Sequence, residues 1–298
     1  MNKIIEVIDR VGGERFEEKV AGRAGLEFLL FTLPGKAALE TIVKKRWFSA
    51  LYGLYQDSRL SRRDIEPFVQ MLDIDMSEAQ RDISAYESFN DFFVRKLRPE
   101  ARPIEDSANR LVLPADGRIT VIPEIRQGQV LSVKGVCFSL AQFLGSESLA
   151  KRYEEGAVVI IRLCPADYHR YHFPLGGIPG PSMRIPGNLY SVNPLAIRAR
   201  PGLFMENERQ ICIHRCDELG EILVIEVGAT MVGKIVQTYE PQRPVQKGDE
   251  KGYFCFGAST TVLVLPPSAV KLDEDLIFNS EKGFETLDKM GRGFATIL

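Results

Sequence analysis

The sequence contains no apolar run near the roughly 20 residues that a membrane-spanning helix requires. It also lacks a basic excess: the net charge is −2 over 298 residues, so no general attraction to nucleic acid is expected. The five cysteines form no compact even framework, which favours free thiols in a reducing compartment. No signal peptide is recognisable, because residues 1–10 carry mixed charge and only a short apolar stretch, and Glu14 and Glu17 are unlike an acid-poor organelle presequence. These absences favour a bacterial protein of the cytosol or of the membrane surface.

What remains is the composition of a folded protein with a substantial core, with 45% hydrophobic and 26% charged residues. Up to about Tyr86, apolar residues recur at the three- and four-residue spacing of amphipathic helices. These positions are Leu26, Leu29, Leu30, Leu33, Leu39, Ile42, Val43, Leu51 and Leu54. Ser61 and Ser77 precede acidic residues and are predicted helix N-caps. We expect residues 1–88 to form a helical region that could lie at a membrane interface.

From Ser88 onwards, short β-rich runs alternate with glycine and proline. The runs cover residues 118–122, 129–133, 158–163, 210–214, 222–227, 231–239 and 260–265. A short helix is expected over residues 139–144. The sequence therefore predicts an α+β protein whose residues 89–298 form a mostly-β domain, built as a barrel or a sandwich with long loops. The boundary near residues 87–90 is inferred only from the change from helical spacing to short β-rich runs.

Ser259 stands in a turn of small residues, Gly257-Ala258-Ser259-Thr260, between two strand-like runs. A serine so placed can attack the peptide bond before it, if a base removes its proton and a third group orients that base. The string is not Gly-x-Ser-x-Gly, so the strained turn of the α/β-hydrolases is absent. Taken alone, the string is equally typical of an ordinary turn serine.

The candidates for the base are few, because the chain has three histidines. His169 and His172 lie three residues apart in a tyrosine-rich segment. Asp116 lies in Pro-Ala-Asp-Gly, a tight turn between two apolar runs. Each of these residue types is common in a purely structural role, and an aspartate before glycine usually forms a turn. Their joint occurrence with Ser259 is what points to chemistry.

The third histidine, His214, lies between Cys212 and Cys216 at alternating positions of a predicted strand. Cysteine and histidine are the usual zinc ligands, so a zinc site is one interpretation. The spacing is a poor zinc pattern and no fourth ligand is evident. We therefore favour plain strand positions and expect no bound metal.

Six blocks of the chain, in the same order, are similar to those of phosphatidylserine decarboxylases, a family of pyruvoyl enzymes. The blocks are residues 88–104, 114–117, 168–174, 207–209, 227–230 and 247–260. The resemblance implies that Asp116, His172 and Ser259 form a triad and that His169 serves decarboxylation. The family usually has Gly-Ser at the cleaved bond, whereas this chain has Ala258-Ser259. Alanine supplies the same carbonyl carbon, so we expect processing to survive, although more slowly if the turn needs a positive φ.

The reaction implied by the resemblance has two stages. The chain cuts itself by serinolysis between Ala258 and Ser259 into fragments 1–258 and 259–298, and Ser259 becomes a covalent pyruvoyl cofactor. Phosphatidylserine then forms a Schiff base with the pyruvoyl group, loses CO2 and leaves as phosphatidylethanolamine. The two fragments are expected to stay together, and a homo-oligomer is compatible with the sequence.

Because this substrate lies in a bilayer, the resemblance also implies a peripheral protein at the cytoplasmic face of the cell membrane. The apolar segment 28–33 and the segment Lys44-Lys45-Arg46-Trp47-Phe48 are the candidates for membrane contact, with cations at the headgroups. The same residues could instead pack helices on the β domain.

Two other classes of function remain open from the residues. Residues 114–118 and 227–235 have the short strands and glycine turns of a non-catalytic carrier domain. Ser259 could also belong to a serine hydrolase that acts on esters. Both alternatives predict an uncut chain.

Overall fold

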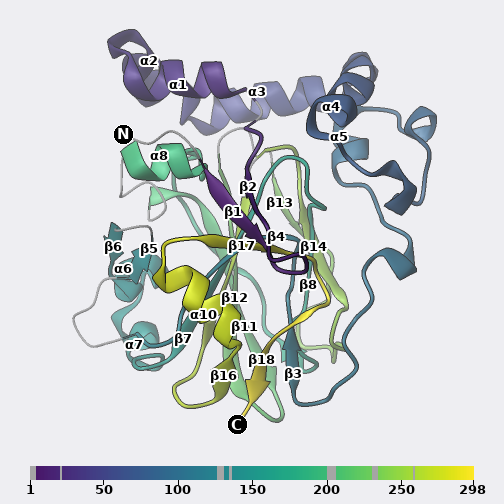
Figure 1. The fold of residues 1–298 in the computed structure, drawn as a ribbon. Helices are drawn as coiled ribbons and strands as arrows, with labels where there is room; N and C mark the ends of the chain where they lie inside the picture. The colour runs from purple at the N-terminus through teal and green to yellow at the C-terminus, as the bar shows by residue number, and fades with distance from the viewer. Residues whose placement is uncertain are drawn as a thin grey trace.

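The computed structural model describes residues 5–20, 22–125, 131–133, 136–199, 206–229, 234–257 and 259–298. Helices gather across one end of the molecule, and strands from both halves of the chain form the body beneath them (Figure 1). The α+β class is therefore confirmed. No described helix is both long enough and apolar enough to cross a membrane.

A ten-stranded sheet forms the body, in the order β10-β11-β12-β15-β7-β4-β17-β1-β2, with β9 paired to β11. Its strands are β1 (Glu6–Asp9), β2 (Arg15–Glu17), β4 (Gly117–Ile122), β7 (Ala157–Leu163), β9 (Ile178–Pro179), β10 (Met183–Ile185), β11 (Arg209–Cys216), β12 (Gly220–Val227), β15 (Ser259–Leu265) and β17 (Glu285–Asp288). Strands β7 and β15 are buried along their whole length. Their near-continuous runs of β-branched and apolar residues are typical of strands covered on both faces.

The remaining strands form three small sheets, in the orders β13-β14-β8, β16-β18-β3 and β5-β6. They are β3 (Arg110–Val112), β5 (Leu131–Val133), β6 (Val136–Phe138), β8 (Arg170–His172), β13 (Ile235–Gln237), β14 (Glu250–Phe254), β16 (Val270–Leu272) and β18 (Gly293–Ile297). The barrel form of the prediction is not found among the described strands, because β10 and β2 remain the edges of the large sheet. The predicted runs at 129–133 and 231–239 fall partly outside the described residues.

The N-terminal region supplies most of the helices, as predicted. They are α1 (Arg23–Phe31), α2 (Leu33–Ala38), the π-helix η1 (Leu39–Val43), α3 (Arg46–Asp57), α4 (Ile65–Leu72) and α5 (Phe89–Phe93), with 3₁₀ turns η2 (Arg59–Asp64), η3 (Met76–Glu78), η4 (Ile83–Ala85) and η5 (Pro99–Ala101). The start of the chain differs from the prediction, because β1 and β2 are strands of the large sheet. Val7 of β1 pairs with Glu285 of β17 in parallel, a partner 278 residues away that local spacing cannot reveal.

Among the described residues, the helices that pack on the β domain are α6 (Leu140–Leu144), α7 (Glu147–Lys151), α8 (Pro194–Ala199) and α10 (Glu274–Glu281). Helix α6 confirms the short helix expected over 139–144, and the Ser139 side chain caps it by accepting from the Gln142 amide. A separate aromatic cluster joins α4 and α5 to the chain just before β15. It contains Phe68, Phe89, Phe92, Phe93 and Phe256. This cluster positions the segment that leads to Ser259.

Candidate active site

Ser259 is the first residue of β15, where it pairs with Leu163 of β7. Its side chain is fully buried, and its Oγ has no hydrogen-bond partner within the described ranges. Gly257 has φ of 143°, a backbone conformation that favours glycine. Ala258, the other half of the predicted cleavage site, lies outside the described residues. The serine thus holds its hydroxyl at the start of a buried strand, away from water.

His169 is fully buried, and its ring lies against Phe93 with 3.9 Å between the ring centroids. Its Nδ1 lies 2.9 Å from the Asp167 carbonyl oxygen. A carbonyl oxygen only accepts, so Nδ1 carries the proton and Nε2 presents a lone pair. That Nε2 has no partner among the described atoms. Burial lowers the pKa of His169 to about 3, so the ring is neutral near pH 7.

His172 ends β8, where it pairs with Glu250 of β14. Its backbone amide donates to the Pro114 carbonyl over 2.8 Å, which brings β8 beside the turn that holds Asp116. The His172 Nδ1 has no partner in the described part of the chain. Burial lowers the pKa of His172 to about 4, so this imidazole is also neutral and able to accept a proton.

Asp116 is buried and is bound by Arg102, whose Nε lies 2.8 Å from Oδ1 and whose Nη2 lies 2.5 Å from Oδ2. The Met290 amide donates to the same carboxylate over 2.9 Å. Within the described residues there is no hydrogen bond from Asp116 to His172, nor from His172 to Ser259. The structure therefore places His172 beside the turn that holds Asp116, while no hydrogen bond among the described residues joins either of them to Ser259.

The strand that approaches Ser259 packs directly on His169. The Phe254 amide donates to the His169 carbonyl over 3.0 Å, and Phe256 contacts the same Phe93 ring that covers His169, at 5.0 Å between centroids. The Phe256 amide is fixed by Asn90, whose Oδ1 accepts it over 3.0 Å. Residues of α5 thus contact both His169 and the segment before Ser259.

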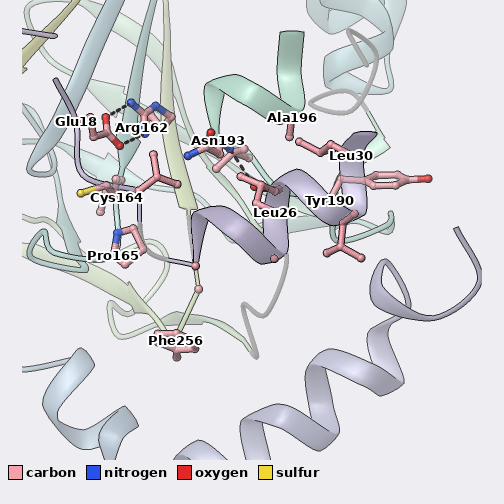
Figure 2. Close-up of a pocket in the computed structure, with 18 of the residues that line it drawn as sticks. Glu18, Leu26, Leu30, Arg162, Cys164, Pro165, Tyr190, Asn193, Ala196 and Phe256 are labelled. Carbon is pink, nitrogen blue, oxygen red and sulfur yellow. Dashed lines mark hydrogen bonds and ion pairs between the residues drawn. The ribbon is translucent and has the colours of Figure 1, made fainter. Parts of the chain in front are cut away.

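A cavity of about 440 Å³ lies between the N-terminal helices and the β domain. Figure 2 shows Leu26 and Leu30 of α1 on one side and Cys164, Pro165 and Phe256 on the other. The lining is mainly apolar and includes Gly257, the last described residue before Ser259. The cavity therefore gives an apolar molecule a place next to the predicted cleavage site.

The polar end of this cavity is a buried charge cluster that sequence reasoning missed. Arg162 of β7 binds Glu18 over 2.6 Å (Figure 2). Arg162 also binds Glu285 of β17 over 2.7 Å, and Arg118 contacts Glu18 over 3.2 Å. Arg102 was also missed, although it lies in the block 88–104 that carries the resemblance. No local pattern identifies such partners, because the carboxylates that bind each arginine lie far away in sequence.

The Cys212, His214 and Cys216 side chains lie on β11, which confirms the interpretation as strand positions. The His214 Nε2 lies 2.9 Å from the Leu175 carbonyl, an ordinary structural bond. The described residues contain no cluster of three or more potential metal ligands.

Comparison with known proteins places the chain in a family. The family described as phosphatidylserine decarboxylase matches residues 89–286. A protein of Clostridium botulinum (strain Alaska E43 / Type E3) called phosphatidylserine decarboxylase proenzyme is 44% identical over 98% of this chain and 99% of its own length. A proenzyme of the same name from Desulfitobacterium hafniense (strain DSM 10664 / DCB-2) is 45% identical over 90% of both chains. A match of this extent shows that the chain belongs to the phosphatidylserine decarboxylase family and is a decarboxylase.

Proposed function

We propose that this chain converts phosphatidylserine to phosphatidylethanolamine and CO2 after it has cut itself between Ala258 and Ser259. Family membership favours this function over the carrier domain and the ester hydrolase, and the relatives bear the word proenzyme in their names. The observation that carries the proposal is the buried Ser259 hydroxyl without a partner. Leaving a buried hydroxyl unpaired costs about 1–3 kcal/mol, which is understandable where the group is consumed by chemistry.

Self-cleavage begins when the neutral His172 takes the proton from the Ser259 Oγ. The oxygen then bonds to the carbonyl carbon of Ala258 as the carbon–nitrogen bond breaks, so an amide becomes an ester. Elimination of the carboxylate of residue 258 leaves a dehydroalanine, and water converts it to a pyruvoyl group with release of ammonia. In the assembled triad, His172 Nδ1 would donate to Asp116, which orients the ring.

Several contacts support the expectation that the two fragments remain joined. Strand β15 lies between β12 and β7, so the new end of fragment 259–298 is held on both sides. Ion pairs also cross the cut, between Arg162 and Glu285 over 2.7 Å and between Arg110 and Asp273 over 2.7 Å.

The residues at the start of β15 fit a pyruvoyl group, because Ser259 is buried away from water and its Oγ forms no hydrogen bond to any described residue. Such a group supplies a carbonyl that draws off the electron pair released when CO2 leaves. The substrate ammonium must lose a proton before its nitrogen can react. The free Nε2 of His169 can take that proton and later return it to the carbon that has lost CO2.

We propose further that the lipid reaches this site through the apolar cavity, from a membrane lying on the N-terminal helices. Trp47, Leu51 and Leu54 lie at i, i+4 and i+7 of α3, and their exposed fractions are 58%, 61% and 68%. Leu33 of α2 is 84% exposed. Exposed apolar residues that share one helix face are typical of a surface that contacts a membrane or a partner. The helices that carry them form one end of the molecule (Figure 1).

The proposal is tested by release of labelled CO2 from phosphatidylserine vesicles. We expect activity from the purified chain and none from Ser259→Ala. Thr261→Val is the matched control, because it also removes a buried, unpartnered hydroxyl from β15 and is expected to remain active. An active Ser259→Ala chain would rule out the proposed cofactor.

A further inference from the structure

Arg95 is a buried arginine that forms no ion pair with any carboxylate of the described residues. It follows α5 and is 4% exposed. Its Nη2 donates to the Ala166 carbonyl over 3.1 Å and lies 3.4 Å from the Asp167 carbonyl. Its Nε and Nη1 have no hydrogen-bond partner among the described residues. Two donor nitrogens of a buried guanidinium are therefore available.

Other buried arginines in this region are neutralised. Arg102 is bound by Asp116, Arg118 by Asp167, and Arg162 by two glutamates. Arg95 has two carbonyl contacts and lies 5.1 Å from the centre of the Phe92 ring, but neither is an anion. A buried charge without an anionic partner costs several kcal/mol, and burial accordingly lowers the pKa of Arg95. An anion that binds Arg95 would accept hydrogen bonds from Nε and Nη1 and balance the charge. The two unused donors therefore point to an anionic ligand.

Arg95 lies beside the candidate active site. The Asp167 carbonyl that it contacts also accepts the hydrogen bond from His169 Nδ1. Arg95 lines a second cavity, of about 200 Å³, together with Asp116, Asp167 and Tyr168. Acidic residues are frequent in this lining. Asp116 and Asp167 are bound by Arg102 and Arg118, and Asp288 and Glu78 by Arg10 and Lys289. The lining also contains Asp9, Asp73 and Asp75, but no carboxylate among the described residues forms an ion pair with Arg95, so its free donors are left to a molecule from outside.

We propose that Arg95 binds the phosphodiester of the substrate headgroup, an inference that rests on the proposed function. The headgroup carries two anionic groups, and they differ in what happens to them. The carboxylate loses its charge as CO2 leaves, so a strong bond from arginine to it would favour the ground state over the transition state. The phosphodiester keeps its charge throughout, so arginine can hold it without opposing the reaction.

The same donors could bind inorganic phosphate, so the experiment distinguishes the phosphodiester of the headgroup from free phosphate. The variants are Arg95→Gln and Arg95→Lys, with Arg98→Gln as the control, because Arg98 is an exposed arginine of the same segment. A denaturing gel first establishes self-cleavage of each chain. We expect both Arg95 variants to be cut. Arg95→Gln should then raise KM by about 10- to 100-fold with little change in kcat, the result of losing uniform binding to a charged group. Arg95→Lys should give a smaller increase and Arg98→Gln none.

Glycerophosphoethanolamine, the soluble headgroup of the product, should inhibit the wild-type enzyme competitively and inhibit Arg95→Gln far less. Inorganic phosphate should inhibit more weakly. Equal KM in a cut Arg95→Gln chain would overturn the proposal. Inhibition by inorganic phosphate alone would overturn the assignment to the headgroup, and failure of both Arg95 variants to cut would place Arg95 in maturation instead. An uncut wild-type chain would contradict the proposed function, a result distinct from all of these.

Discussion

Arg102 and Asp116 form a buried, two-nitrogen ion pair, with contacts of 2.8 Å from Nε and 2.5 Å from Nη2. Asp116 also accepts from the Met290 amide. Met290 belongs to the proposed small fragment and Arg102 to the large one, so Asp116 links both sides of the cut. To orient His172, Asp116 must accept a hydrogen bond from a third residue while Arg102 and Met290 stay bound. Otherwise, one nitrogen of Arg102 must leave the carboxylate. Arg102 is therefore placed to control how Asp116 acts.

We predict that Arg102→Met lowers the free energy of unfolding by about 3–5 kcal/mol, because it leaves Asp116 buried and charged without a cation. Adding Asp116→Asn should restore part of this loss, since the unpaired charge is then gone. Urea unfolding in a Ser259→Ala background, where the chain stays whole, measures both variants. A double variant no more stable than Arg102→Met alone would show that the pair is not the cause.

We predict that the two histidines act at different stages. His172→Ala and Asp116→Ala should leave the chain uncut, because both belong to the activation of Ser259. His169→Ala should be cut normally but should release CO2 about 10²–10⁴-fold more slowly, the usual contribution of general acid–base catalysis. A gel for cleavage beside a CO2 assay distinguishes the stages. An uncut His169→Ala chain would move His169 into maturation, and a fully active one would make it a packing residue.

The buried histidines should make stability depend on pH. Their pKa values are lowered to about 3 for His169 and about 4 for His172, against 6.5 as the ordinary value. Below about pH 6.5 the unfolded chain therefore takes up protons that the folded chain cannot. Stability should be fully present above that pH and should fall toward pH 4, by about 1.4 kcal/mol per pH unit for each histidine.

The check is urea unfolding of the Ser259→Ala chain between pH 6.5 and 4.5. Replacing His169 by Gln in that background should make the slope shallower by about 1.4 kcal/mol per pH unit. An unchanged slope would mean that His169 titrates alike in the folded and unfolded chains.

We predict that the exposed face of α3 binds membranes. Replacing Trp47, Leu51 and Leu54 together with serine should release the protein from anionic vesicles without lowering its melting temperature, because these side chains are exposed. Salt should weaken the electrostatic part of wild-type binding. The control is Phe278→Ser on α10, which removes an equally exposed aromatic residue from another surface. Vesicle binding that persists in the triple variant would place the contact elsewhere.

The sequence was most informative where local pattern and burial agree. Strands β4, β7, β11, β12 and β15 were predicted within a few residues, because continuous apolar runs fit a sheet covered on both faces. The predicted caps were wrong. The hydroxyl of Ser61 lies inside η2 and donates to the Gln56 carbonyl over 2.9 Å, while Asp75 rather than Ser77 caps η3. Short turns satisfy these serines in ways that a helix pattern does not anticipate.

The connections around the candidate site residues could not be predicted from the sequence. Ser259, His169 and His172 are each buried, and their roles in catalysis stay predictions. The side chains of segment 28–33 differ in exposure: Leu30 is buried, whereas Phe28 and Leu33 are exposed. Lys44, a predicted headgroup contact, binds Glu40 and the Tyr190 hydroxyl instead. The contact between Lys44 and Tyr190 joins residues 146 positions apart. Such a contact depends on the whole fold and cannot be predicted from a local sequence pattern.

The most direct test of the central claim is denaturing mass spectrometry of the purified wild-type protein. We predict two fragments, residues 1–258 and 259–298, and a small fragment whose mass corresponds to a pyruvoyl group in place of its first serine. The small fragment should also lack a free amine at that end. A single chain of 33.5 kDa that decarboxylates phosphatidylserine at full rate would contradict the account.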